Sequence, residues 1–136
     1  MRTIIEENVF YPIKFISMKV NVLGDAYYDP NDLAKFSEIG EFAPDLWQKF
    51  IGYYASVFEE GDLTAREKVI VALAVAHTVQ CPYCIDAYTQ SCLEHGVNAA
   101  QMTEAIHVAA AIRGGATLIH GVQMKNIINK LEMKNE

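Results

Sequence analysis

The sequence predicts an all-α fold of about six helices joined by short loops. Three observations support this. From residue 29 onward, apolar residues recur three or four positions apart, as they do along one face of a helix. No segment alternates convincingly between apolar and polar residues, as a half-buried strand would. Capping residues, prolines and glycines mark where successive helices begin and end.

The chain has 136 residues, which is the size of one domain. Residues 1–28 mix β-branched residues with Gly24 and show no helical period. We therefore expect a weakly ordered N-terminal extension over residues 1–28 and a single helical domain over residues 29–136.

Two helices are expected at the start of this domain. Asp29 followed by Pro30 is typical of a helix N-cap and first turn, and Gly40 ends that short helix. Pro44 begins the next helix, which ends at Gly61. Its apolar stripe consists of Leu46, Trp47, Phe50, Ile51, Tyr54, Val57 and Phe58.

The middle of the domain holds the most apolar predicted helix. Thr64 and Glu67 have the spacing of a capping box, in which each side chain bonds the other residue's backbone N–H. The helix that follows, over residues 65–79, is apolar nearly all round, so we expect it to be the buried central helix. A further helix begins at Pro82 and runs to Gly96.

Two helices are expected in the C-terminal part. Asn98, with Gln101 three residues later, predicts another capped helix start. We expect that helix to end at Gly114 and Gly115, and a last helix to follow them. The apolar residues of the last helix are Leu118, Val122, Ile127, Ile128 and Leu131.

The charge balance excludes several classes of partner. Seventeen acidic residues outnumber eleven basic ones, for a net charge of −6, whereas nucleic acids and anionic membranes attract basic surfaces. Charges interrupt the apolar residues near the N-terminus, and the longest uncharged run, residues 69–85, is short for a membrane span. We therefore expect a cytoplasmic protein without nucleic-acid or membrane partners. Because 51% of the residues are hydrophobic, we also expect a homo-oligomer.

The main chemical feature is the sequence Cys81-Pro-Tyr-Cys84. Its position predicts two sulfurs at the first turn of a helix, where backbone N–H groups and the helix dipole favour a thiolate. The spacing of three residues allows the sulfurs to form a disulfide, so one can attack a substrate and the other can resolve the product. This pattern favours redox chemistry.

Two other interpretations of the cysteine pair stay open. Two cysteines supply half of a zinc site, with His77 as the nearest further ligand, but no second pair stands at zinc-finger spacing. Alternatively, both cysteines are buried and inert, because free cysteine is among the most buried residue types. Cys92, two turns after Cys84, is expected in the core. His77 is expected to bond a carbonyl near its helix end, or else to accept a thiol proton.

The cysteine motif and the helix before it resemble those of a known family. The stretch from Leu63 to His77, followed by Cys81-Pro-Tyr-Cys-Ile-Asp-Ala-Tyr, resembles the carboxymuconolactone decarboxylase / alkyl hydroperoxidase D-like family. Within that family, residues 27–133 are most similar to the arsenosugar biosynthesis-associated peroxidase-like subgroup. The segments similar to this subgroup are Tyr27-Tyr-Asp-Pro, Leu46-Trp, Ala111-Ile-Arg-Gly-Gly-Ala and His120-Gly-Val-Gln-Met.

The resemblance implies an all-helical protein that assembles as trimers or hexamers and reduces peroxides with its thiols. Carried over by position, Cys84 would attack the peroxide or a disulfide and Cys81 would resolve the product. A dithiol protein would return the electrons, and neither a cofactor nor a metal is implied. A role in organoarsenic metabolism would follow from the subgroup. The alternative is a vicinal-thiol protein that binds a soft metal or trivalent arsenic without turnover.

The sequence departs from the hydroperoxidase pattern at its proton relay. Val69 stands where the family has a glutamate, and Tyr83 and Tyr88 stand where it has histidines. Tyrosine does not act as a base at neutral pH, although its hydroxyl donates hydrogen bonds. Tyr83 and Tyr88 are therefore candidate supporting residues, and Glu67 and His77 are candidate substitutes for the missing base. We expect weak peroxidase activity or a more general thiol–disulfide exchange role.

Overall fold

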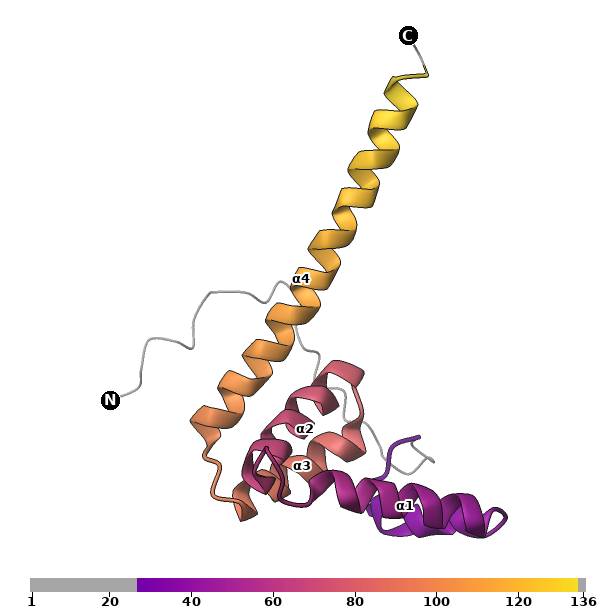
Figure 1. Cartoon of the computed structure of the whole chain (residues 1–136), viewed down its shortest axis with the longest axis vertical. Helices are drawn as coiled ribbons and strands as arrows, with labels where there is room; N and C mark the ends of the chain where they lie inside the picture. The colour runs from indigo at the N-terminus through magenta and orange to yellow at the C-terminus, as the bar shows by residue number, and fades with distance from the viewer. Residues whose placement is uncertain (1–26, 135–136) are drawn as a thin grey trace, which may run out of the picture.

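The computed structural model of this chain describes residues 27–134. The predicted N-terminal extension lies outside the described residues, except for its last two. The described part contains five helices and no strand, which confirms the all-α prediction (Figure 1). They are the 3₁₀ helix η1 (Pro30–Gly40) and the α-helices α1 (Pro44–Phe58), α2 (Ala65–Val79), α3 (Pro82–Glu94) and α4 (Ala99–Glu132).

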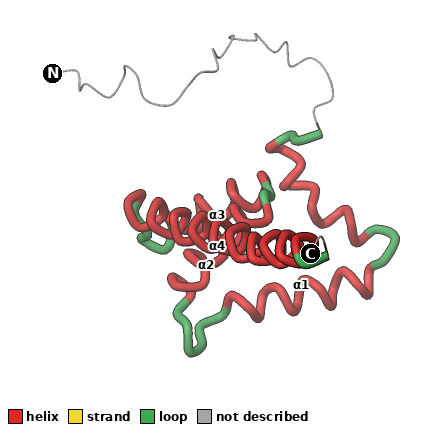
Figure 2. Tube along the Cα trace, turned by 90° about the horizontal axis from the view of Figure 1, so that it is seen from above, coloured by secondary structure: helices red, strands yellow, loops and turns green. Residues whose placement is uncertain are grey.

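The helices form a packed group with two projections. Helices α2, α3 and the first part of α4 pack together. Helices η1 and α1, which a short loop joins to each other, lie to one side of them (Figure 2). The rest of α4 extends far beyond the other helices (Figure 1). The C-terminal end of α2 and the N-terminal end of α3 meet in a tight turn, where Gln80 adopts a left-handed conformation with φ 57°.

The helix starts predicted before Gly114 are confirmed. The Asp29 side chain accepts a hydrogen bond from the backbone of Asn31 at the start of η1. Complete capping boxes begin α2 and α4, and they join Thr64 to Glu67 and Asn98 to Gln101. Each box satisfies backbone donors that a helix start otherwise leaves free.

The core lies where α2 faces α3 and α4. Val69, Leu73, Cys92 and Val97 are each at most 3% exposed, and Cys92 was correctly predicted to be a core residue. Partly buried residues around them complete the cluster, namely Phe58, Ile70, Tyr88 and Met102.

Helix α2 is buried on one face only, so its predicted burial all round is wrong for the single chain. Val71, Val75 and Val79 are between 52% and 64% exposed on its other face. An apolar pattern on all sides of a helix predicts that both faces are buried, but it does not show that a single chain buries both.

Helix α4 also differs from its prediction. Gly114 and Gly115 do not end a helix, because they lie in the middle of one continuous helix of 34 residues. Each interior glycine costs only about 1 kcal/mol relative to alanine, and no proline interrupts the segment. The Arg113 side chain also donates a hydrogen bond to the Thr78 carbonyl and ties α4 to the end of α2.

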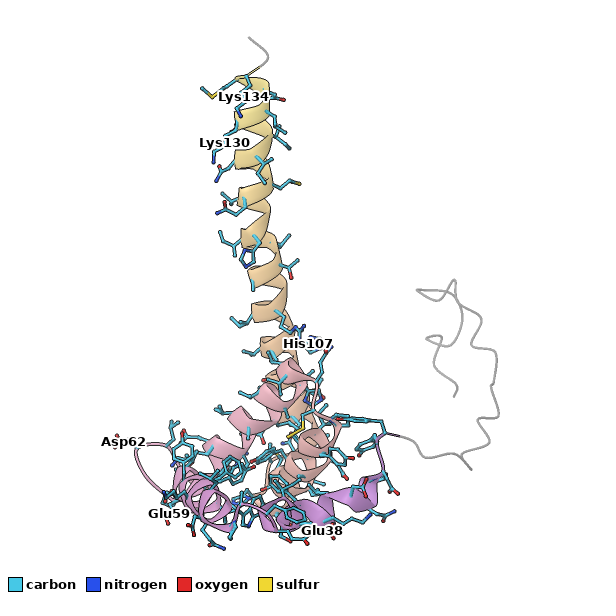
Figure 3. The ribbon with its side chains drawn as sticks, turned by 90° about the vertical axis from the view of Figure 1, so that its right-hand side faces the viewer. Glu38, Glu59, Asp62, His107, Lys130 and Lys134 are labelled. Carbon is cyan, nitrogen blue, oxygen red and sulfur yellow. A yellow bond between two sulfur atoms is a disulfide. The ribbon has the colours of Figure 1, made fainter. Side chains whose placement is uncertain are left out.

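The C-terminal part of α4 lacks partners within the described chain. Beyond Arg113, which still bonds the end of α2, the helix leaves the packed group, and Lys130 and Lys134 lie near its far end (Figure 3). From residue 110 onward almost every described side chain is exposed, including large apolar ones such as Leu118 and Ile119. Among the described helices, α4 alone is long and apolar enough to cross a membrane, and a single helix of this kind is weak evidence for a membrane span.

Candidate functional site

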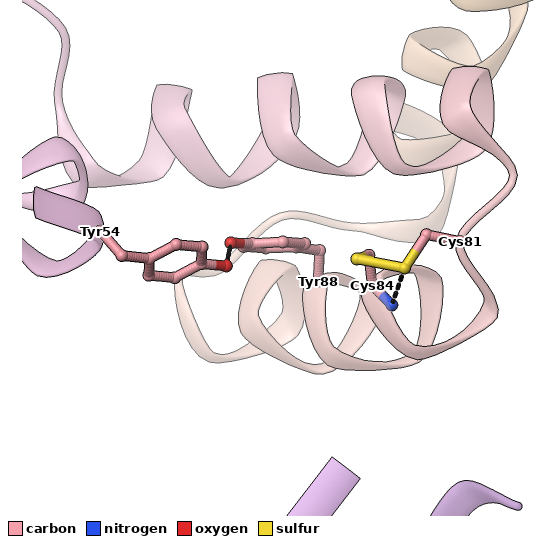
Figure 4. Close-up of a disulfide and its surroundings, with 4 residues drawn as sticks. All are labelled: Tyr54, Cys81, Cys84 and Tyr88. Atoms are coloured by element: carbon pink, nitrogen blue, oxygen red, sulfur yellow. Dashed lines mark hydrogen bonds between the residues drawn. A yellow bond between two sulfur atoms is a disulfide. The ribbon is translucent and has the colours of Figure 1, made fainter. Parts of the chain in front are cut away.

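Cys81 and Cys84 lie together at the start of α3. Their sulfurs are joined in a disulfide, with Cα atoms 5.2 Å apart, and both residues are half-buried (Figure 4). Cys81 is the N-cap residue of α3, and its Sγ accepts a hydrogen bond of 3.2 Å from the Cys84 backbone N–H. The Cys81 backbone N–H donates to the Ala76 carbonyl at 3.1 Å, which fixes the motif against the end of α2.

This geometry gives the two sulfurs different environments. A backbone N–H directed at Cys81 Sγ favours negative charge on that sulfur when the disulfide opens. In an exchange reaction the sulfur that better holds negative charge leaves faster. The favoured exchange is therefore attack on Cys84 with departure of Cys81.

Two grooves meet at Cys84. The first, here called the α2 groove, has a volume of about 490 Å³, and the exposed valines of α2 line it together with Cys84 and Tyr88. The second, here called the η1 groove, has a volume of about 670 Å³ and is lined by Leu33, Phe36, Ile51, Cys81, Cys84 and Tyr88 among others. Cys84 borders both grooves and Cys81 borders only the second, so Cys84 is the sulfur accessible from more directions.

A pair of tyrosine hydroxyls stands at the junction of these grooves. The Tyr54 hydroxyl from α1 and the Tyr88 hydroxyl from α3 are hydrogen-bonded to each other, and the Tyr88 ring lies between Tyr54 and the disulfide (Figure 4). Both residues line both grooves. Partial burial raises the pKa of Tyr54, so its hydroxyl keeps its proton.

Tyr54 was not among the site residues predicted from the sequence. It belonged to the apolar stripe of its helix, where an aromatic residue is expected to pack. Its ring does pack, against Phe50 and Phe58 with centroids 5.8 Å and 5.2 Å away. Only the fold shows that its hydroxyl meets Tyr88, because the two residues are 34 positions apart.

Tyr83 lies on the other side of the motif. Its ring packs against Tyr28 with centroids 4.7 Å apart, and its hydroxyl donates to the Tyr27 carbonyl at 3.5 Å. Tyr83 lines the η1 groove but not the α2 groove. Tyr27 and Tyr28 are therefore held beside the cysteine motif.

His77 bonds the backbone, which is the first of the two roles expected for it. Its Nδ1 lies 2.8 Å from the Leu73 carbonyl, and because a carbonyl only accepts, Nδ1–H is the donor. His77 is half-buried near the end of α2 and lines neither groove.

Glu67 and Val69 supply no base to the cysteines. The Glu67 carboxylate accepts hydrogen bonds from the Thr64 backbone and hydroxyl at 2.7 Å and 2.8 Å, and these bonds hold the pKa of this carboxyl below its ordinary 4.5. From Glu67 to the C-terminal end of α2 the helix rises roughly 18 Å, so Glu67 lies at the end opposite the disulfide. Val69 is a core residue.

Cys92 is separate from the pair. It is fully buried and its thiol donates to the Val69 carbonyl at 3.5 Å, and this burial raises the pKa of the Cys92 thiol. Among residues 27–134, no group of three or more His, Cys, Asp or Glu side chains is placed to hold a metal ion.

Comparison with known proteins places this arrangement in a family. The family model described as the carboxymuconolactone decarboxylase family matches residues 44–124. "Uncharacterized protein 4 in cox locus" of Paracoccus denitrificans is 31% identical over 103 residues, covering 76% of this chain and 93% of that protein. An uncharacterised protein of Cupriavidus necator is 26% identical over 81 residues, covering 60% of this chain and 72% of its own length.

A solved structure supports the fold. The crystal structure of a protein from Methanobacterium thermoautotrophicum is 31% identical and superposes with a TM-score of 0.60, covering 62% of this chain and 94% of the other. The matched segment 44–124 contains the cysteine motif, both tyrosines of the hydroxyl pair and the core of α2. The chain belongs to the carboxymuconolactone decarboxylase family.

Proposed function

We propose that this protein is a thiol–disulfide oxidoreductase with peroxidase-like activity. The observation that carries the proposal is the Cys81–Cys84 disulfide at the start of α3, half-buried and bordered by two grooves. A disulfide of three-residue spacing beside open space is placed to exchange with a partner, whereas a purely structural pair has no need of access.

The proposed cycle balances as follows. Reduced Cys84 attacks a peroxide, the O–O bond breaks, and an alcohol leaves while Cys84 becomes a sulfenic acid. Cys81 attacks that sulfur, closes the disulfide and releases water. A dithiol protein then attacks Cys84, Cys81 departs, and the carrier's second thiol releases Cys84 as the carrier itself becomes oxidised. With a disulfide substrate the first step is the same attack by Cys84.

Steady-state turnover tests this cycle. Purified protein with dithiothreitol should consume tert-butyl hydroperoxide, and Cys84→Ser should reduce the rate to the uncatalysed level. Cys92→Ser is the matched control, because it removes a sulfur that borders neither groove, and it should keep most of the rate. If Cys84→Ser turns over as fast as the original protein, the proposal is wrong.

A link to organoarsenic metabolism is part of the proposal. It is supported by the similarity of residues 27–133 to the arsenosugar-associated subgroup and by two vicinal thiols, which suit a soft or trivalent centre. Arsenite titration of the reduced thiols would measure this. If the protein binds arsenite tightly and stoichiometrically but turns over no peroxide or disulfide, it is a vicinal-thiol binding protein and not an enzyme.

The protein is also proposed to act in the cytoplasm as a homo-oligomer, a trimer or hexamer, assembled through α4. The support is the unpartnered apolar surface of that helix, where Leu118 is 79% and Ile119 is 65% exposed. Surfaces of this kind mark sites of association. Sedimentation should show a trimer or hexamer that Leu118→Glu dissociates, and a monomer at micromolar concentration would contradict the assembly.

A further inference from the structure

The Tyr54–Tyr88 hydroxyl pair has an unused donor in the grooves that Cys84 also lines. Each hydroxyl has one hydrogen to donate and two lone pairs. One hydrogen is used in the bond between the two, and the described chain gives neither hydroxyl another side-chain or backbone partner. One hydrogen therefore remains free at the junction of two grooves that Cys84 lines.

Tyr88 is the member of the pair that shares a helix with the cysteines. Tyr88 is four residues after Cys84 on α3, so the two side chains lie on one face of the helix. Tyr54 reaches the pair from α1, and Tyr88 lies between it and the disulfide (Figure 4). The bond between the hydroxyls can run in either direction, and with Tyr54 as its donor the Tyr88 hydrogen is left for the substrate.

Breaking a peroxide bond requires a proton donor for the leaving oxygen, and the cysteines do not supply one. When a thiolate attacks one oxygen of an alkyl hydroperoxide, the other leaves as a strongly basic alkoxide and needs a proton. A second hydroxyl that donates to the first makes it a stronger donor, since linked hydrogen bonds polarise one another. The raised pKa of Tyr54 keeps its hydroxyl protonated for this task.

We propose that the Tyr88 hydroxyl binds the departing oxygen of a peroxide under attack by Cys84 and gives it a proton, with Tyr54 as the positioning residue behind it. This inference rests on the proposed function. In the step, the S–O bond forms, the O–O bond breaks, the alkoxide takes the Tyr88 hydrogen, and water returns a proton to the tyrosinate. The electrons come from Cys84 alone.

The aromatic rings explain why the pair holds its place. The Tyr88 ring stacks on Phe58 with centroids 5.4 Å apart, and Tyr54 packs on Phe58 at 5.2 Å. Phenylalanine at either position keeps these contacts and removes only the hydroxyl. Tyr53 provides a control, because it lines the α2 groove and is 70% exposed but makes no hydrogen bond within the described chain.

Two oxidants with different leaving groups test the proposal in single turnovers of the reduced protein. tert-Butyl hydroperoxide needs a proton on its leaving oxygen, whereas Ellman's disulfide releases a thiolate that is stable without one. Tyr88→Phe should slow the hydroperoxide reaction roughly 100-fold, the lower end of the range of general acid catalysis. Tyr54→Phe should slow it less, roughly 10-fold, because Tyr54 acts only through Tyr88. Both should react with Ellman's disulfide within about twofold of the original protein, and Tyr53→Phe should change neither reaction.

Three results would overturn the inference. Equal slowing with both oxidants would show that the pair only shapes the grooves. Unchanged rates with both would show that the hydroxyls have no role. A protein that reacts with Ellman's disulfide but with no hydroperoxide would end this inference and keep the exchange function, whereas one inert to both would end the proposed function itself.

Discussion

Helices α2 and α3 begin in the same way and serve different purposes. Each starts with a side chain that accepts a hydrogen bond from the backbone N–H three residues later, at 3.2 Å in both cases. At α2 the acceptor is the hydroxyl of Thr64, and Glu67 completes a capping box. At α3 the acceptor is the sulfur of Cys81, and the third residue is Cys84.

The difference shows how one structural position can favour stability or chemistry. A hydroxyl is a good cap. A carboxylate at the third position accepts a hydrogen bond from the backbone N–H of the cap residue and interacts favourably with the helix dipole. Sulfur is a weak acceptor, so α3 lacks part of that stabilisation. Instead, the backbone N–H groups and the dipole at the start of α3 act on two sulfurs whose disulfide can form and break.

The largest expected effect comes from giving α3 the cap of α2. Cys81→Ser restores a hydroxyl cap, so the free energy of unfolding under reducing conditions should stay the same or rise by up to about 1 kcal/mol. Turnover driven by a dithiol carrier protein should stop, because the sulfenic acid on Cys84 can no longer be converted to the disulfide that the carrier reduces. Intact mass should show one added oxygen after one equivalent of peroxide. Undiminished turnover would break the contrast between the two helix starts.

The converse change removes the cap of α2. Thr64→Ala should lower the free energy of unfolding by about 1 kcal/mol, because the cap bond to the Glu67 backbone is lost. Turnover should be unchanged, since Thr64 lies at the end of α2 that is far from the cysteines. Chemical denaturation and the hydroperoxide assay measure the two quantities. A loss of turnover at full stability would place Thr64 in the chemistry instead.

The smallest effect is a pH dependence of stability at the same cap. The pKa of Glu67 is lower in the folded chain than its ordinary 4.5, so its carboxylate form stabilises the fold. That contribution is fully present above pH 4.5 and is lost as the pH falls through the lower, folded value. Glu67→Gln should therefore unfold with a weaker dependence on pH in the acid range. Thermal melts between pH 3 and pH 7 compare the two, and identical slopes would contradict the prediction.

The sequence predicts the local features of this fold well. Capping boxes at Thr64 and Asn98, the proline at the start of α3 and the buried position of Cys92 follow from residue types and spacing. The break predicted at Gly114 and Gly115 was wrong, because two glycines weaken a helix without ending it. Whether a helix continues through such a segment depends on the helix propensities of all its residues summed over its whole length.

Long-range features of the site were harder to predict. Cys81 and Cys84 are close in sequence, so their spacing alone indicated a pair at a helix start. The Tyr54–Tyr88 pair joins two helices that are distant in sequence, and the aromatic stripe around Tyr54 explained that residue fully as packing. Likewise, the valine face of α2 indicated burial, although within one chain it lines a groove.

The central claim is that Cys81 and Cys84 cycle between dithiol and disulfide. The most direct test is mass spectrometry of the reduced protein after one equivalent of tert-butyl hydroperoxide, with digestion at Asp86 to separate Cys92 from the pair. The account predicts a loss of two hydrogens confined to the fragment that contains both Cys81 and Cys84. A fragment that keeps its reduced mass, or oxidation found at Cys92 instead, would contradict it.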